Sequence, residues 1–350
     1  MYIEQKNFGY LSNGDEVILY KLSNSNGITV DIISLGGIIK SIVLPDKNKE
    51  LADVVLGQDS LTDYLTRPAC SGAIIGRCAN RISGGAYTYN DKVIELEKNY
   101  GSDTLHSASG CYAMKNFVGE TFIEADRIGV ILYLKDDGEG GFPGCVELWV
   151  TYSLDKEGRL SIHYKAVPSE DTVINITNHA YFNLAGDSSG PINNHILKLE
   201  ADYYLPNDKR GMPTGEILKV NKTPLDFIDE KPIGREINSV YTQIALFGGY
   251  DHSYCIRGRG LRKAATVMHK ESGRTMVVYT DLPALQFYTA NMLPENFLGK
   301  NGAVYKRHQG FCLETQHYPN AVNYSQFPSP FYKAGEVFDS QTIFRFFVKE

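Results

Sequence analysis

The chain has few of the features that mark a secreted, membrane-bound or nucleic-acid-binding protein. Residues 1–10 show no basic segment followed by an apolar one, so we expect no secretory signal. No apolar run approaches the roughly 20 residues that span a bilayer. Acidic residues number 41 against 35 basic ones, a net charge of -6. A nucleic-acid binder usually has a basic excess, and a net negative charge gives no reason to expect an anionic membrane as partner, so we expect neither.

Cysteine is also sparse, and its spacing excludes a disulfide framework. No two cysteines form a Cys-x-x-Cys pair, and the six are dispersed through 350 residues. This pattern is typical of buried free thiols in a reducing compartment. We therefore expect a cytoplasmic protein without disulfides. The six positions are Cys70, Cys78, Cys111, Cys145, Cys255 and Cys312.

The common sequence signatures of cofactor and metal chemistry are missing. There is no Gly-x-Gly-x-x-Gly and no Walker loop, so a nucleotide cofactor has no support. There is no His-Glu-x-x-His and no cysteine–histidine cluster at zinc spacing. We expect no cofactor and no metal ion.

What the chain does contain is typical of β-structure. It has 23 Tyr and 16 Phe against one Trp, with 33 Gly and 14 Pro. Apolar and polar residues alternate through 146–154, a polar turn follows, and the alternation resumes through 160–166. Residues 130–134 show the same period of two. This pattern predicts a β-meander with one buried face.

Further strands are expected at 17–22, 27–33, 38–44, 195–201, 275–280 and 284–289. Helical periodicity is weak, and only 59–65 and 233–246 could each hold a short helix. Strands do not alternate with long helices, which argues against a parallel α/β sheet. No linker or repeat divides the chain. The sequence predicts an all-β fold, a large antiparallel β-sandwich with few short helices, in a single domain spanning 1–350.

Six dense polar segments interrupt the strand pattern, and these are the candidates for chemistry. They lie at 76–82, 104–107, 177–186, 248–252, 285–289 and 310–316. Glu314 stands out, because it lies in the aromatic-rich stretch 311–318, where a carboxylate is partly desolvated. Desolvation raises the pKa of a carboxyl group and makes it a better base near neutral pH.

Taken together and in order, these segments resemble the aldose 1-epimerase family, the galactose mutarotases. The resemblance covers nearly the whole chain. Its motifs in this sequence are Asp53-Val54-Val55-Leu56-Gly57, 76–82, Leu105-His106, Asp137-Gly138-Glu139, Phe142-Pro143-Gly144, 178–186, Pro213-Thr214-Gly215, Asp226-Phe227, Gly249-Tyr250-Asp251-His252, Leu285-Gln286-Phe287-Tyr288 and Leu313-Glu314-Thr315-Gln316 with Pro319 and Asn323.

The resemblance implies a β-sandwich with an open sugar-binding cleft. It also implies cofactor-free interconversion of the α and β anomers of a free aldose such as galactose or glucose. His179 matches the family's general acid and Glu314 its general base. The residues that match sugar-holding positions are Asn80, Arg81, His106, Asp251 and Gln286. The expected partner is a monosaccharide, and the sequence does not fix the oligomeric state.

The chemistry of ring opening suits a histidine and a carboxylate. A proton must reach the ring oxygen, and another must leave the anomeric hydroxyl. Imidazole and carboxyl groups exchange protons in the neutral range. After the C1–C2 bond rotates, closure reverses both transfers, so His179 and Glu314 exchange roles.

Three other functions are open at this stage. An epimerase for a phosphorylated hexose would need a basic pocket, for which Arg77 and Lys115 are candidates. A non-catalytic sugar-binding protein would have little need for a desolvated glutamate opposite a histidine. A glycoside hydrolase would use a pair of carboxylates, which Glu314 and Asp251 could form.

Overall fold

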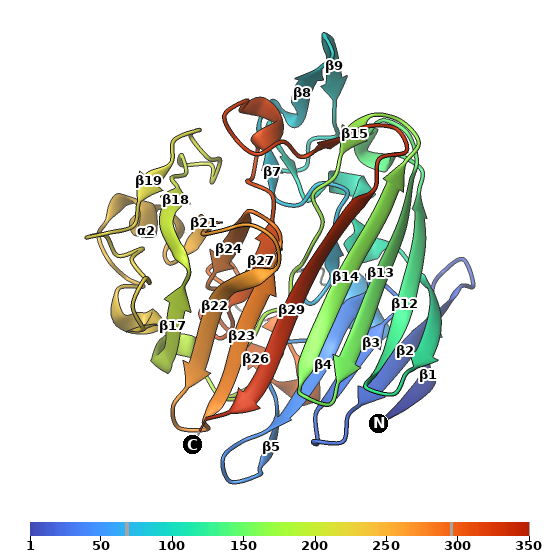
Figure 1. Cartoon of the computed structure of the whole chain (residues 1–350), viewed down its shortest axis with the longest axis vertical. Helices are drawn as coiled ribbons and strands as arrows, with labels where there is room; N and C mark the ends of the chain where they lie inside the picture. The colour runs from blue at the N-terminus through green and yellow to red at the C-terminus, as the bar shows by residue number, and fades with distance from the viewer. Residues whose placement is uncertain (67–69, 295–296, 350) are drawn as a thin grey trace.

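The computed structural model describes residues 1–66, 70–294 and 297–349. Within them the chain folds into antiparallel sheets and two short α-helices, which confirms the expected all-β class (Figure 1). The largest sheet has nine strands, in the order β11 (Val118–Ile123), β12 (Arg127–Asp136), β13 (Val146–Asp155), β14 (Arg159–Pro168), β29 (Phe338–Val348), β23 (Arg274–Thr280), β22 (Arg262–His269), β17 (His195–Leu199) and β20 (Lys231–Pro232).

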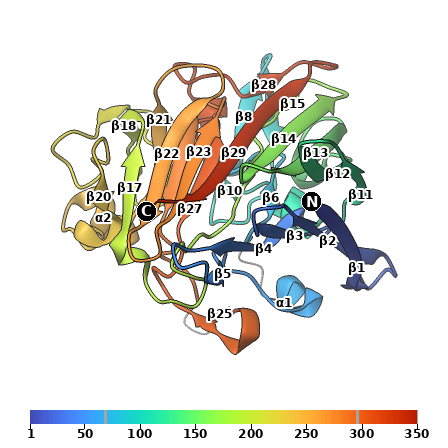
Figure 2. The same cartoon turned by 60° about the horizontal axis from the view of Figure 1, so that its bottom comes forward.

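Two five-stranded sheets accompany the nine-stranded sheet, and Figure 2 shows the N-terminal one beneath it. The N-terminal sheet contains β1 (Tyr2–Tyr10), β2 (Glu16–Ser23), β3 (Thr29–Ile33), β4 (Ile38–Pro45) and β5 (Leu51–Asp53). The other runs in the order β19 (Leu218–Lys219), β18 (Ala201–Leu205), β21 (Asp251–Ile256), β24 (Ala284–Tyr288) and β27 (Cys312–Gln316).

The remaining strands form short two-stranded pairs. They are β6 (Ile74–Ile75) with β16 (Thr177–Asn178), β7 (Arg81–Ile82) with β10 (Thr104–Leu105), β8 (Ala86–Tyr89) with β9 (Lys92–Glu95), β15 (Thr172–Val173) with β28 (Phe331–Tyr332), and β25 (Phe297–Leu298) with β26 (Val304–Tyr305). The helices are α1 (Leu61–Thr66) and α2 (Thr242–Phe247), near both expected positions. Helix α2 ends at Gly248, whose φ of 61° is the left-handed conformation that glycine adopts without strain.

The expected alternation of buried and exposed residues holds in the central strands. In β13, Val146, Leu148 and Val150 are fully buried, and Val150 lies opposite Tyr164 of β14. The main hydrophobic core combines buried side chains from all three large sheets. One strand expectation needs correction. The run 195–201 is two strands in different sheets, because β17 pairs with β22 and the chain then passes to β18, which pairs with β21.

The packing of β27 determines which of its faces is available for chemistry. Its Thr315 hydroxyl contacts the Thr342 hydroxyl of β29, in the nine-stranded sheet. Side chains alternate along a strand, so Leu313 and Thr315 share that inner face. Cys312 and Glu314 therefore point to the opposite side, away from the nine-stranded sheet.

A buried ion pair holds the loop that follows β12. Arg77 is 1% exposed, and its Nε donates to Asp136 Oδ2 at 2.8 Å. Tyr112 donates its hydroxyl to the same oxygen. The guanidinium also donates to the carbonyl oxygens of Pro143 and Gly144. Arg77 is thus fully engaged within the protein.

All six cysteines have free thiols, as expected, but only Cys78 and Cys312 are buried. The other four are partly exposed, because they lie at the edges of core clusters or in loops. Among the described residues, no helix has the length and apolar character needed to cross a bilayer.

Replacing Asp136 with Asn would leave the buried Arg77 guanidinium without its ionic partner. Breaking one side of a buried pair costs about 3–5 kcal/mol. We expect Asp136→Asn to lower the free energy of unfolding, measured by denaturant titration, by that order. Glu139→Gln, which breaks a more exposed pair with Lys115, is the matched control and should cost far less. Equal losses in the two variants would contradict the stabilising role of the buried pair.

Candidate active site

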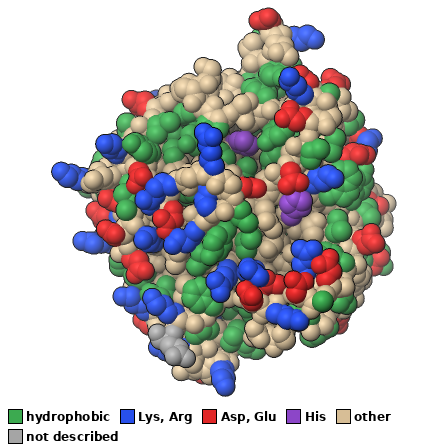
Figure 3. Space-filling model, viewed as in Figure 1, with side chains coloured by type: hydrophobic (Ala, Val, Ile, Leu, Met, Phe, Trp, Pro, Cys, Tyr) green, Lys and Arg blue, Asp and Glu red, His purple; other side chains and the backbone are tan. Residues whose placement is uncertain are grey.

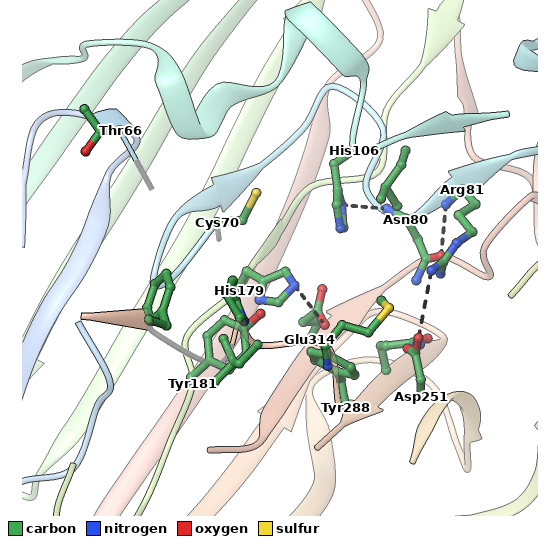
Figure 4. Close-up of a pocket in the computed structure, with 16 residues that line it drawn as sticks. Thr66, Cys70, Asn80, Arg81, His106, His179, Tyr181, Asp251, Tyr288 and Glu314 are labelled. Atoms are coloured by element: carbon green, nitrogen blue, oxygen red, sulfur yellow. Dashed lines mark hydrogen bonds and ion pairs between the residues drawn. The ribbon is translucent and has the colours of Figure 1, made fainter. Parts of the chain in front are cut away.

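A cavity of about 610 Å³ lies over one face of the sheet that contains β21, β24 and β27. All seven residues that the sequence singled out line it, and Figure 4 shows six of them labelled around one space. The remaining lining residues are Thr66, Cys70, Leu105, Tyr181, Tyr288, Met292, Leu293, Pro294 and Phe297. Candidate residues that are far apart in the sequence therefore line the same cavity.

Three adjacent strands supply the polar floor of the cavity. Asp251 comes from β21, Gln286 from β24 and Glu314 from β27. Gln286 lies directly opposite Glu314 in the β24–β27 register. Its Nε2 donates to Asp251 Oδ1 at 2.6 Å. The sheet thus places the carboxyl group of Asp251 on one side of the Gln286 amide and that of Glu314 on the other.

His179 reaches the cavity from the segment that follows β16. Its backbone N–H donates to the Ala73 carbonyl at 2.8 Å, and its carbonyl accepts from Gly72 N–H at 2.9 Å. These bonds hold the backbone of His179 on both sides. Its Nε2 lies 3.8 Å from Glu314 Oε1, as the dashed line in Figure 4 marks. That separation is too long for a hydrogen bond, so the two groups face each other without being joined.

Asn80 and His106 form a reciprocal pair on the opposite wall. The His106 N–H donates to the Asn80 carbonyl, and the Asn80 N–H donates to His106 Nδ1 at 3.1 Å. Burial, with the nearby His179 and Arg81, lowers the pKa of His106 well below its usual value. A neutral His106 whose Nδ1 accepts carries its proton on Nε2. His106 is therefore a hydrogen-bond donor at its free nitrogen.

Arg81 supplies the positive charge of the cavity. Its Nη2 lies 3.9 Å from Asp251 Oδ2, and its guanidinium lies 5.0 Å from the centroid of the Tyr100 ring. Asn80 Oδ1 accepts from the Arg81 backbone N–H, which fixes the turn between them. Arg81 is thereby held between a carboxylate and an aromatic ring.

Three buried polar atoms of the cavity residues have no hydrogen-bond partner within the described chain. They are Arg81 Nε, Gln286 Oε1 and Glu314 Oε2. An unsatisfied buried polar group costs about 1–3 kcal/mol. One donor and two acceptors around a single cavity match a small ligand that carries several hydroxyl groups.

Burial shifts the pKa values of the facing pair in opposite directions. It raises the pKa of Glu314 well above the usual carboxyl value; the charge of Asp251 adds to this effect and that of Arg81 opposes it. Burial lowers the pKa of His179 to about 4. Desolvation disfavours the charged form of each group. Between these two pKa values, the pair holds a single exchangeable proton.

Aromatic and apolar side chains form the rest of the wall, and the sequence reasoning did not assign them. The ring centroids of His179 and Tyr181 are 5.0 Å apart, and those of Tyr181 and Tyr288 are 6.1 Å apart. Tyr288 follows Gln286 by two positions in β24, so strand parity could have indicated it. No such signal exists for Leu293, which lies in an irregular segment, or for Phe297, which begins the two-residue strand β25.

One cluster beside the cavity contains metal-ligating residue types. Ligand atoms of His179, Cys312 and Glu314 all lie within 4.8 Å of one another. Such a spacing could hold a metal ion, so the expectation of a metal-free site stays a prediction. Cys312 Sγ lies 3.5 Å from His179 Nδ1, on the far side of the ring from Nε2.

Comparisons with known proteins agree over nearly the whole chain. The family model described as aldose 1-epimerase matches residues 19–345. A galactose mutarotase from Homo sapiens is 39% identical and covers 97% of each chain, and an aldose 1-epimerase from Escherichia coli is 33% identical and covers 95% of this chain and 96% of that one. A solved galactose 1-epimerase from Lactobacillus acidophilus aligns with a TM-score of 0.88 at 26% identity, covering 100% of this chain and 99% of that one.

Replacing Asp251 with Asn removes a negative charge that raises the pKa of Glu314. We therefore expect the pKa of Glu314 to fall in Asp251→Asn, as measured by carbon-13 NMR titration of labelled glutamate. Asp339→Asn is the matched control, since the exposed Asp339 pairs with the partly exposed His163 on the nine-stranded sheet. An unchanged or higher Glu314 pKa in Asp251→Asn would contradict this electrostatic coupling.

Proposed function

The chain belongs to the aldose 1-epimerase family, and from that premise we propose that His179 and Glu314 transfer the protons of its reaction. The protein is an isomerase that interconverts the α and β anomers of free aldoses such as galactose or glucose. The observation that carries the proposal is the facing of His179 Nε2 and Glu314 Oε1 across a cavity lined by unsatisfied polar atoms.

The reaction needs one group on each side of the anomeric centre. Glu314 removes the proton of the anomeric hydroxyl while His179 delivers a proton to the ring oxygen, and the ring opens. Rotation about the C1–C2 bond presents the other face of the aldehyde. The protonated Glu314 and neutral His179 then reverse both transfers to close the ring. The pair holds one exchangeable proton throughout. The shifted pKa values of both groups favour that proton on Glu314 in the unliganded site, so it passes to His179 before the ring opens.

The other cavity residues hold the sugar in this proposal. Arg81 and His106 donate hydrogen bonds to sugar hydroxyls, and Asp251 accepts from them. Gln286 offers its free Oε1 while its Nε2 stays bonded to Asp251. Asn80 acts beside them through its bonds to His106 and Arg81. The partner is thus a monosaccharide, and the expectation of a cytoplasmic location stays a prediction.

The alternative of a phosphorylated substrate loses its candidate residues. Arg77 is committed to Asp136, and Lys115 pairs with Glu139. Among the described residues that line the cavity, Arg81 supplies the one basic side chain, and it already faces Asp251. On the face of the molecule that Figure 3 shows, Lys and Arg side chains are interspersed with Asp and Glu side chains. Nothing in this arrangement favours a phosphate group.

Removing either proton-transfer group should abolish most of the activity. General acid–base catalysis contributes about 10²–10⁴-fold, so we expect kcat for conversion of α-D-galactose to fall by that order in His179→Asn and in Glu314→Gln. Polarimetry of freshly dissolved sugar, with the buffer rate subtracted, measures it.

The matched controls are His163→Gln and Glu147→Gln, at a partly exposed and an exposed position of the nine-stranded sheet. Both should retain the wild-type rate. Full activity in folded His179→Asn and Glu314→Gln would refute the assignment of roles. Sugar binding without mutarotation by the wild type would instead favour the non-catalytic alternative, and release of a chromogenic aglycone would favour a glycoside hydrolase.

Glucose 6-phosphate should be a poorer substrate than glucose. Its phosphate would bring further negative charge toward Asp251, and Arg81 is the one Lys or Arg side chain among the described lining residues. Burying a poorly paired charge is costly, so we expect kcat/KM to be lower by about tenfold or more. Polarimetry on the two sugars at equal concentration gives the ratio, and a preference for the phosphorylated sugar would overturn this prediction.

A further inference from the structure

Cys312 occupies a position from which it contacts His179 and not the cavity itself. It is fully buried at the start of β27, two residues before Glu314 and on the same face of that strand. Its Sγ lies 3.5 Å from Nδ1 of His179, within the range of a hydrogen bond to sulfur. The other ring nitrogen, Nε2, faces Glu314 at 3.8 Å. β27 therefore contacts both nitrogens of the same imidazole.

The proposed reaction dictates where the second proton of His179 must be. Nε2 gives a proton to the ring oxygen and takes one back when the ring closes. In the neutral imidazole, one nitrogen is a donor and the other an acceptor. Nε2 can accept only if the neutral ring keeps its proton on Nδ1. That proton then points to Cys312.

The sulfur of Cys312 is suited to accept this hydrogen bond without becoming charged. Burial, with the charges of Glu314 and Asp251, raises the pKa of the Cys312 thiol well above its usual value. The thiol therefore stays protonated, and its sulfur is a weak, neutral acceptor. The rings of His106, Tyr181 and Tyr288 also lie beside the imidazole, with centroids 5.0–6.3 Å from that of His179. The backbone of His179 itself interacts with the ring as well, which partly offsets the effect of burial on its pKa.

We propose that Cys312 is a positioning residue, whose sulfur accepts the Nδ1–H of His179 and so leaves Nε2 as the nitrogen that exchanges protons with the sugar. The inference rests on the proposed function, since the reaction is what requires a free Nε2.

A neutral acceptor at this place also has a consequence for the balance of protons. A carboxylate there would favour the imidazolium and raise the pKa of His179. The thiol adds no such charge, so the neutral imidazole stays accessible, and the two members of the pair can exchange one proton in either direction. A sulfur acceptor thus matches a reaction in which the acid and base exchange roles.

Nitrogen-15 NMR of histidine-labelled protein tests the proposal without any substrate. The signals of His179 are those that disappear in His179→Asn. In the wild type, at a pH above the His179 pKa, we expect the proton on Nδ1. In Cys312→Ala, which removes the acceptor, we expect a mixture of the two tautomers. A wild-type His179 with its proton on Nε2 would overturn the proposal, as would an unchanged tautomer in Cys312→Ala.

Kinetic measurements on the Cys312 variants are the second test of the proposal. Loss of one hydrogen bond corresponds to about tenfold in rate, so we expect Cys312→Ala to lower kcat by about that factor with little change in KM. Cys312→Ser retains an acceptor oxygen and should restore the tautomer and most of kcat. Cys255→Ala, at a thiol outside the cavity lining, is the control and should behave as the wild type.

The outcomes separate this proposal from the proposed function. If Cys312→Ser loses the tautomer and the rate as fully as Cys312→Ala, the shape of the side chain and not its hydrogen bond is responsible, and the proposal is wrong. If the wild type catalyses no mutarotation, the proposed function fails, while the tautomer of His179 is still read from the spectrum.

Discussion

Burial of His179 opposite Glu314 is the constraint on which the rest of this site depends. Both groups are nearly inaccessible to solvent, and burial pushes each toward its neutral form. The 3.8 Å between Nε2 and Oε1 is too long for a hydrogen bond between them. The pair is therefore left with one proton, and both groups are available to hydrogen-bond a sugar. Acid and base of this kind can exchange roles within one catalytic cycle.

Strand packing and backbone hydrogen bonds hold this pair in its buried position. β27 packs on β29 through Thr315, which leaves the face with Glu314 toward the cavity. The backbone of His179 is hydrogen-bonded on both sides to the segment of Gly72 and Ala73, next to β6. Helices contribute little, and the cavity is built on one face of the sheet that contains β21, β24 and β27 and from the turns that approach it. The sheet fixes the spacing of Asp251, Gln286 and Glu314 on the cavity floor. The turns place Asn80 and His106 on the opposite wall.

Much of this could be predicted from the sequence, for reasons that differ between elements. Clean alternation of apolar and polar residues located β12, β13 and β14. The same rule missed β29, because its buried positions include Ser340 and Thr342, which disguise the period of two. His179 and Glu314 were found through the order of polar segments that resemble the family. Their roles remain a proposal that the variants above test.

Other features could not be predicted, because they depend on contacts between distant segments. The charge of Arg77 made it a candidate phosphate ligand. In the structure, Asp136, which lies 59 residues further along the chain, binds it in the core. The reciprocal bonds of Asn80 and His106 follow from the pairing of β7 with β10. No periodic pattern in the sequence predicts that Leu293 and Phe297 form part of the cavity wall. Cys312 was visible in the sequence only as one thiol among six.

The most direct test of this account is infrared difference spectroscopy of the unliganded protein against Glu314→Gln. At about pH 6, an ordinary glutamate is ionised. The account predicts a carboxylic-acid carbonyl band in the wild type that is missing in Glu314→Gln, because burial keeps Glu314 protonated while His179 is neutral. If the difference spectrum shows only the bands of an ionised carboxylate, the pair rests as an ion pair or with no proton to exchange, and the account is contradicted.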